Sequence, residues 1–185
     1  MASDANASIS IAVTMDGLLS YSSAAVVAIP AEERAVWENG RIYTYTRVLV
    51  DRAVAGELAP GGEAWIRTMG GIIGKIGQRV EGEAVFVTGR PSLVFLHPGP
   101  VGAFEVTARG QGQFPVVLDE QKTVRLIRSS VVGALLMPRP GPRDATDAQA
   151  QGTSKPQLAA EAIHGRLLDD VAQDVNAAWT RAHGK

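Results

Sequence analysis

Several residue types and features that carry chemistry are scarce in this chain or absent from it. Cysteine is missing from all 185 residues, which excludes disulfide frameworks, thiolate nucleophiles and thiolate metal sites. Histidine occurs only as His97, His164 and His183, without the i, i+4 spacing of a helical zinc site, so no metal or other cofactor is predicted. No run reaches the roughly 18 apolar residues of a membrane span.

Charge of one sign is not in excess either. Eighteen basic residues face nineteen acidic ones, for a net charge of −1. That balance provides no overall field to attract a polyphosphate backbone or an anionic membrane, so nucleic acid is not an expected partner.

The first ten residues lack the basic start and long apolar run of a secretory signal peptide. A mature exported chain that begins near Asp4 would have the same appearance. We therefore expect a periplasmic or secreted location if a signal peptide has been removed, and a cytoplasmic one otherwise.

What is present is enough apolar sequence to fold, since 45% of residues are hydrophobic. The sharpest local signal is Asn39-Gly40, because both residues accept the positive φ of a type I′ hairpin turn. Before it, residues 24–37 predict a strand that is bent or bulged at Pro30. After it, Ile42–Val50 alternates with a period of two and predicts a long half-buried strand.

More short strands are expected downstream, at intervals of about ten residues. They are predicted at 64–68, 84–87, 93–97, 104–108, 114–118 and 123–127, while the apolar run 131–137 is left unassigned. This spacing, with Gly or Pro between the runs, favours an antiparallel barrel or sandwich over alternating β-α-β units. We predict a mainly β fold, a small antiparallel OB-like barrel or a sandwich, followed by a C-terminal amphipathic α-helix.

Helical signals stand at both ends of the strand-rich region. Thr14 is expected to cap a short helix that ends near Ser22. Far downstream, 138–155 is rich in Pro, Ala, Asp, Gln, Thr and Ser and predicts a flexible linker. An amphipathic helix should then begin at Pro156 and continue through Arg181. The predicted organisation is a β-barrel domain over 1–137, the linker over 138–155 and the helix over 156–185.

The glycine-rich segment 70–82 resembles a phosphate cradle, but its spacing matches neither a Walker loop nor Gly-x-Gly-x-x-Gly. We therefore interpret it as a wide inter-strand loop. No Gly-x-Ser-x-Gly elbow occurs, and Glu81 and Glu83 are expected to be solvated, so an enzyme is not predicted. Tyr43 and Tyr45 share a strand face, which is more typical of cross-strand packing than of a stacking platform for bases or sugars.

Several short pieces together carry a resemblance. They are Leu18-Leu19 before Ser22–Ala28, the hairpin Asn39–Thr44, the Gly70-Gly71 loop, Gly89 before Leu93–Leu96, and Gln111–Phe114. In these pieces the chain resembles uncharacterised exported bacterial proteins that are similar to the OB-fold barrel of netrin-like and metalloproteinase-inhibitor domains. The resemblance covers about residues 14 to 118 and implies a fold more than an activity. Those inhibitors chelate the protease metal through an amino-terminal cysteine, which this chain lacks, so protease inhibition is not implied.

These observations lead to the expectation of a non-catalytic protein-interaction or structural module, of the bacterial envelope or of a larger assembly. The expected contacts are Arg67, Gly70, Gly71, Gly74, Lys75, Gln78 and Arg79 around the glycine-rich loop, and Leu167, Leu168, Val171, Val175 and Trp179 on the terminal helix. The helix would bind another protein, mediate self-association, or pack on its own barrel. The alternatives are a hydrolase with carboxylate chemistry and an OB domain that binds single-stranded nucleic acid or sugar.

Overall fold

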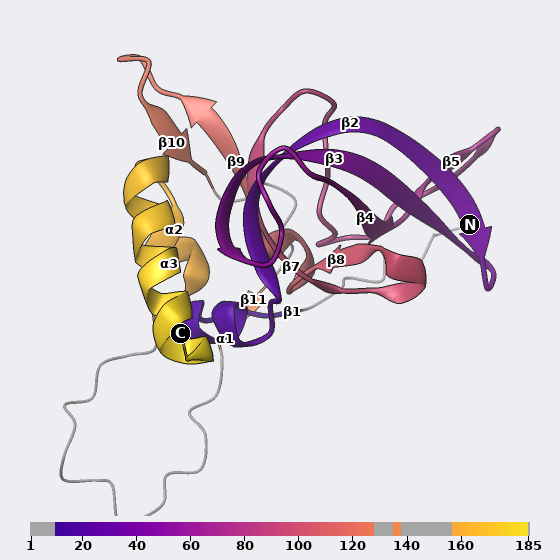
Figure 1. Cartoon of the computed structure of the whole chain (residues 1–185). Helices are drawn as coiled ribbons and strands as arrows, with labels where there is room; N and C mark the ends of the chain where they lie inside the picture. The colour runs from indigo at the N-terminus through magenta and orange to yellow at the C-terminus, as the bar shows by residue number, and fades with distance from the viewer. Residues whose placement is uncertain (1–9, 128–134, 138–156, 185) are drawn as a thin grey trace, which may run out of the picture.

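The computed structural model describes residues 10–127, 135–137 and 157–184 (Figure 1). Its strands are β1 (Ser10–Ile11), β2 (Ala24–Glu38), β3 (Arg41–Gly56), β4 (Glu63–Met69), β5 (Gly71–Ile73), β6 (Ile76–Gln78), β7 (Ser92–Pro98), β8 (Phe104–Val106), β9 (Gln113–Leu118), β10 (Val124–Leu126) and β11 (Leu135–Leu136). Its helices are α1 (Met15–Ser20), α2 (Ala159–Ile163) and α3 (Leu168–His183), with 3-10 turns η1 (Pro100–Gly102) and η2 (Arg109–Gly112).

Five of the strands close into a barrel. They pair in the order β2-β3-β4-β8-β7, and β7 pairs again with β2. The predicted mainly β barrel with a C-terminal helix is thus confirmed, and a barrel rather than a sandwich is observed. Within the barrel, the expectation of wholly antiparallel pairing is wrong at one place, since β4 and β8 run parallel. A closed ring with an odd number of strands cannot alternate direction throughout, so one neighbouring pair has to be parallel.

The β2–β3 hairpin supplies the longest strands of the barrel, which arch across the molecule in Figure 1. Its turn has φ of 49° at Asn39 and 78° at Gly40, as the Asn-Gly signal predicted. The register of β2 against β3 shifts between Pro30 and Glu32, which confirms the predicted bulge. Proline has no N–H for the ladder, so the irregularity falls where a hydrogen bond would be missing anyway.

Aliphatic side chains fill the barrel interior. Each strand of the barrel contributes alternate residues, as the period of two requires. The buried members of this cluster are Val26, Ala28, Val48, Val50, Ala64, Ile66, Ala84, Val94, Leu96 and Val106. The barrel is therefore a packed core and not a pore.

A second apolar core lies outside the barrel wall, between the strands β2, β3, β7, β9 and β10 and the three helices. Thr14 caps α1 as predicted, with its Oγ1 accepting a hydrogen bond from the Gly17 amide at 3.1 Å. Phe95 and Phe114 meet edge to face in this core. Because α3 also packs there, the structure answers the question that the sequence left open: the terminal helix covers its own barrel.

The terminal helix is not continuous as predicted. It is broken into α2 and α3 at Gly165, which has φ of 79°. The backbone of the break pairs with β10: the Gly165 amide donates to Leu126 O at 2.8 Å, and the Leu126 amide donates to Arg166 O at 3.0 Å. The predicted linker 138–155 and the helix start at Pro156 lie outside the described residues, as does most of the run 131–137.

The segment 84–87 is not a strand, contrary to the prediction. A side chain takes the place of a neighbouring strand there. The Val85 amide donates to Gln113 Oε1 at 3.0 Å, and Gln113 Nε2 donates to Val85 O at 2.7 Å. The segment is thereby fixed across the barrel end without joining the sheet. Across the described helices, none combines the length and apolarity that a membrane span requires.

Candidate functional site

A cleft of about 610 Å³ opens where one end of the barrel meets the β5–β6 hairpin and the 79–86 segment. Its floor is formed by Thr46, Thr68, Glu83 and Ala84, all of which are buried. The volume is within the range of pockets that hold small ligands or anchor side chains. We call this cleft, with its floor and rim, the barrel-mouth cleft.

The wall of the cleft continues the inner face of β3. Val48 and Val50 belong to the aliphatic interior, and the next inward positions toward the hairpin are Thr46 and Thr44. The interior therefore changes from methyl groups to hydroxyl groups as it approaches the opening.

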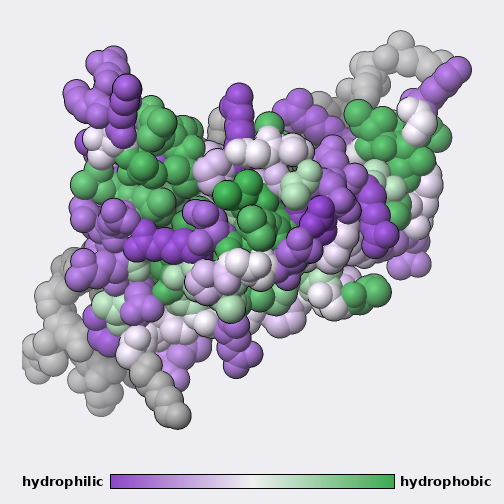
Figure 2. Space-filling view, turned by 45° about the horizontal axis from the view of Figure 1, so that its top comes forward, coloured by the Kyte–Doolittle hydropathy of each residue, from purple (hydrophilic) through white to green (hydrophobic). Residues whose placement is uncertain are grey.

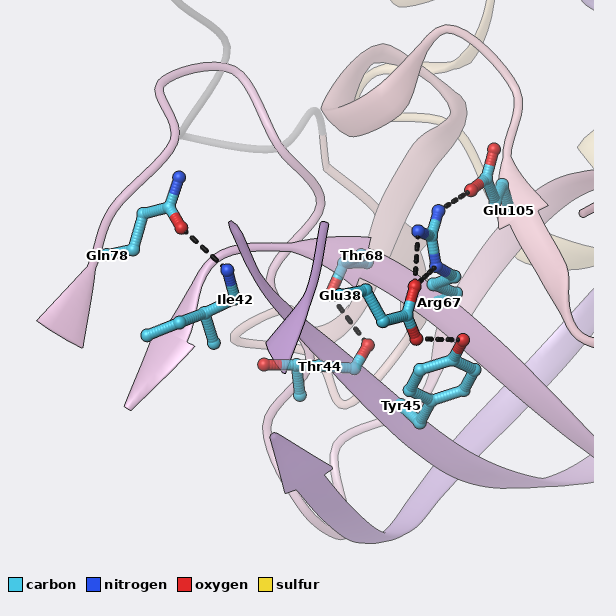
Figure 3. Close-up of polar contacts among 8 residues, drawn as sticks. All are labelled: Glu38, Ile42, Thr44, Tyr45, Arg67, Thr68, Gln78 and Glu105. Atoms are coloured by element: carbon cyan, nitrogen blue, oxygen red, sulfur yellow. Dashed lines mark hydrogen bonds and ion pairs between the residues drawn. The ribbon is translucent and has the colours of Figure 1, made fainter. Parts of the chain in front are cut away.

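Two of the threonine hydroxyls, those of Thr44 and Thr68, already use their protons within the fold. Thr44 Oγ1 donates to Gly70 O at 2.7 Å. Thr68 Oγ1 donates to Thr44 O at 3.4 Å, as Figure 3 shows. A hydroxyl has a single proton but two lone pairs. What these two side chains can still offer to a ligand is hydrogen-bond acceptance.

Glu83 is the buried acid of the cleft, with only 7% of its surface exposed. Its carboxyl accepts hydrogen bonds from the backbone amides of Ala84, at 3.3 Å, and Met69. Burial raises the pKa of Glu83 above its ordinary value of 4.5, although these amides and the positive charge of Arg109 oppose the rise. The expectation that Glu83 is solvated is therefore wrong, because the loop folds back over the barrel end.

The raised pKa of Glu83 predicts a dependence of stability on pH. The folded state holds the Glu83 proton more tightly than the unfolded state, so the free energy of unfolding should fall as pH rises from 4.5 through the folded-state pKa. Glu83→Gln should remove this fall, so the stability of the variant relative to wild type should increase with pH. The increase should be about 1.4 kcal/mol for each tenfold difference in Glu83 proton affinity between the folded and unfolded states.

Urea unfolding between pH 4 and pH 8 measures this effect. Glu81→Gln is the matched control, since Glu81 is exposed on the same segment. A constant difference between Glu83→Gln and wild type across that range would contradict the assignment.

The glycine-rich segment forms the rim of the cleft, and most of it is the β5–β6 hairpin instead of an open loop. Four of the residues that the sequence predicted as contacts lie together in the lining of the cleft: Gly70, Gly71, Gln78 and Arg79. Gly71 has φ of 138°, and a Cβ there would lie 2.4 Å from Thr44 Oγ1, so only glycine fits this close approach.

The hairpin is held to the barrel by a side-chain amide. Gln78 Oε1 accepts a hydrogen bond from the Ile42 amide, at the start of β3, over 2.8 Å (Figure 3). The turn residues Gly74 and Lys75 stand at the exposed tip of the hairpin, outside the cleft lining.

Arg67, by contrast, does not belong to this site. It lies on the outer face of the barrel, where its guanidinium bonds Glu38 Oε2 at 2.6 Å and Glu105 Oε1 at 2.6 Å (Figure 3). Burial would lower the pKa of Arg67, but its hydrogen bonds to the two carboxylates raise it overall. Its charge is fully engaged within the chain.

The two tyrosines of β3 are engaged on the same outer face. The Arg67 guanidinium carbon lies 3.4 Å from the Tyr43 ring centroid. The Tyr45 hydroxyl donates to Glu38 Oε1 at 2.6 Å, and burial together with this bond raises the pKa of Tyr45. These contacts support the packing interpretation and leave little ring surface for bases or sugars.

The apolar stripe predicted on the terminal helix faces the second core. Val171 and Val175 are buried in it, and Leu168 and Trp179 are partly buried against it. Leu167 is the residue before α3, and it bridges to Arg125 of β10. The prediction that this stripe contacts another protein therefore needs correction, because the stripe is already covered by the barrel.

Sequence reasoning missed the threonines and Glu83. For the threonines a signal existed: Thr44 and Thr46 alternate with Tyr43 and Tyr45, so they had to share the opposite face of the strand. No local pattern marks Glu83 as buried, because its environment comes from segments distant in the chain.

Within the described ranges, no group of three or more His, Asp or Glu side chains could hold a metal ion. No protein-family model, no curated protein and no solved structure matches this chain.

Proposed function

We propose that the chain is a non-catalytic binding module whose barrel-mouth cleft receives an extended segment of a partner protein. The observation that carries this proposal is that exposed apolar side chains surround the opening of a cleft whose floor is largely polar. Ile72, on β5, is 74% exposed, and Val85, on the opposite segment, is 54% exposed. Exposed apolar side chains around a concavity are typical of interaction sites.

The rim extends beyond the lining itself. Ile76, on β6, and Val87, two residues after Val85, are also at least half exposed. Figure 2 shows a cluster of hydrophobic side chains at its upper right, at the end of the molecule where Figure 1 places the β5–β6 hairpin. A partner segment that lies across the rim would remove this apolar surface from water.

We further propose that the barrel is of the OB type, the fold to which the resemblance to netrin-like and metalloproteinase-inhibitor domains points. The closed five-strand order and the parallel β4–β8 pair support this assignment. A role in the bacterial envelope or in a larger assembly stays part of the same proposal.

Selection of peptides tests the binding function directly. A library of random 12-residue peptides displayed on phage is panned against the full chain, and the enriched sequences are titrated as synthetic peptides. The double variant Ile72→Ser/Val85→Ser should weaken their binding roughly tenfold or more, since it removes apolar surface worth more than 1.4 kcal/mol.

Leu118→Ser is the control, because Leu118 is equally exposed but lies on β9, outside the cleft. It should bind the peptides as wild type does. Failure to enrich any sequence, or equal binding by the rim variant, would remove the proposed function.

One observation favours a second function, a hydrolase with carboxylate chemistry. Glu83 is a buried acid with a raised pKa in a cleft that Glu33 also lines, as general acids often are. Turnover of chromogenic glycosides or esters that Glu83→Gln abolishes would establish it. Turnover that Glu83→Gln leaves unchanged, or no turnover by the wild-type chain, would exclude it.

A further inference from the structure

We propose that the floor of the barrel-mouth cleft accepts a cationic side chain, Lys or Arg, from the bound partner segment. This inference rests on the proposed function and names the chemistry by which the cleft would recognise its partner.

The first observation is the charge of the lining. Three carboxylates, those of Glu33, Glu81 and Glu83, line the cleft against one guanidinium, that of Arg79. Arg79 is exposed at the rim, whereas Glu83 lies at the floor. Glu33 and Glu81 are exposed like Arg79, so the lining is net negative and Glu83 is the carboxyl that a deeply bound group would meet.

The second observation is that Glu83 lacks a cation of its own. Throughout the described part of the chain, no Lys, Arg or His side chain forms an ion pair with it. Arg109 acts on it only from a longer distance. A buried carboxylate with backbone donors alone is costly to ionise, and an incoming cation would offset that cost.

The hydrogen-bonding capacity of two threonines, Thr44 in the wall and Thr68 in the floor, is the third and independent observation. The hydroxyl protons of Thr44 and Thr68 are donated to backbone carbonyls, so both side chains face a ligand as acceptors. Lysine and arginine carry donors only. A carboxylate or a carbonyl group would find no donor on these two side chains.

The rim complements the remainder of such a segment. Gln78 Oε1 is occupied by the Ile42 amide, which leaves the Gln78 Nε2 group as a donor for a peptide carbonyl, next to Arg79. The aliphatic stem of a Lys or Arg side chain would pack between Ile72 and Val85, while its charged end reaches Glu83. Both parts of an amphipathic side chain thus have a place.

Small probes that mimic single residues test this recognition directly. N-acetyl-lysine methylamide and N-acetyl-arginine methylamide are titrated into the 15N-labelled full chain, and the amide signals of Met69 and Ala84, which hydrogen-bond Glu83, are followed. The neutral isostere N-acetyl-norleucine methylamide is the matched ligand. We expect saturable shifts with the cationic probes and at least roughly tenfold weaker binding of the isostere.

The protein variants complete the test as a double-mutant cycle. Glu83→Gln should abolish the preference for the cationic probes. Glu57→Gln removes the same charge from an exposed position in the turn between β3 and β4, so it should preserve the preference. Equal binding of lysine and norleucine probes, a preference that survives Glu83→Gln, or no saturable shift would each overturn the inference. Peptides selected in the panning experiment without basic residues would overturn it too, while leaving the binding function in place.

Discussion

Replacing Val175 with Asp is expected to lower the free energy of unfolding by about 3–5 kcal/mol, because it places an uncompensated charge in the apolar core between α3 and the barrel wall. Small domains are stable by only about 5–15 kcal/mol, so this single change should remove a large share of the stability. Urea denaturation followed by tryptophan fluorescence measures the loss.

Gln173→Asp is the control, since it introduces the same charge at an exposed position of the same helix and should have little effect. Val175→Ala should lower the free energy of unfolding by about 2 kcal/mol. This milder variant keeps the test informative if the Asp variant does not fold. A Val175→Asp variant as stable as wild type would mean that α3 does not stabilise the barrel in solution and is free for a partner.

The second large effect is expected from Arg67→Met. Arg67 is 12% exposed in its side chain and holds two carboxylates, Glu38 and Glu105, on the outer face of the barrel. Removing the guanidinium leaves both acids without their shared cation and takes away its contact with Tyr43. We expect a loss of about 3 kcal/mol, the lower end of the range for breaking a buried pair, because the two carboxylates are only partly buried.

Arg47→Met provides the comparison. Arg47 also bridges two carboxylates, Glu32 and Glu63, but both lie in water at the surface, and exposed ion pairs contribute little to stability. The Arg47 variant should therefore unfold almost as wild type does. Equal losses from the two substitutions would show that the Arg67 cluster gains nothing from its burial.

The strands of the β2–β3 hairpin were predictable because their signals are local. A period of two, an Asn-Gly turn and a proline without an amide proton act within a few residues of one another. The cap at Thr14 is of the same kind, since it bonds an amide three positions along the chain. In each of these places the structure agrees with the prediction.

The wrong strand at 84–87 has a physical cause that recurs elsewhere in the chain, which is that side chains replace backbone partners over long distances. Gln113 bonds both polar groups of Val85, and Gln78 bonds the Ile42 amide in the position of a strand neighbour. Gln111 does the same for Val13 and Ile11, through its Oε1 at 2.9 Å and its Nε2 at 3.0 Å. A glutamine has no sequence signal for such a role, because its partner is decided by the folded chain.

The sequence by itself determined that the strands of the β2–β3 hairpin extend, where that hairpin turns, which face of β3 is inward, and that one stripe of the terminal helix is apolar. Each of these follows from the covalent geometry and hydropathy of neighbouring residues. Tertiary structure alone decided that β4 and β8 run parallel, that the apolar stripe covers the barrel, and that Glu83 is buried beside the threonines of the mouth. Burial, and with it the pKa of a carboxyl, depends on which distant segments exclude water from it, and no local pattern records that.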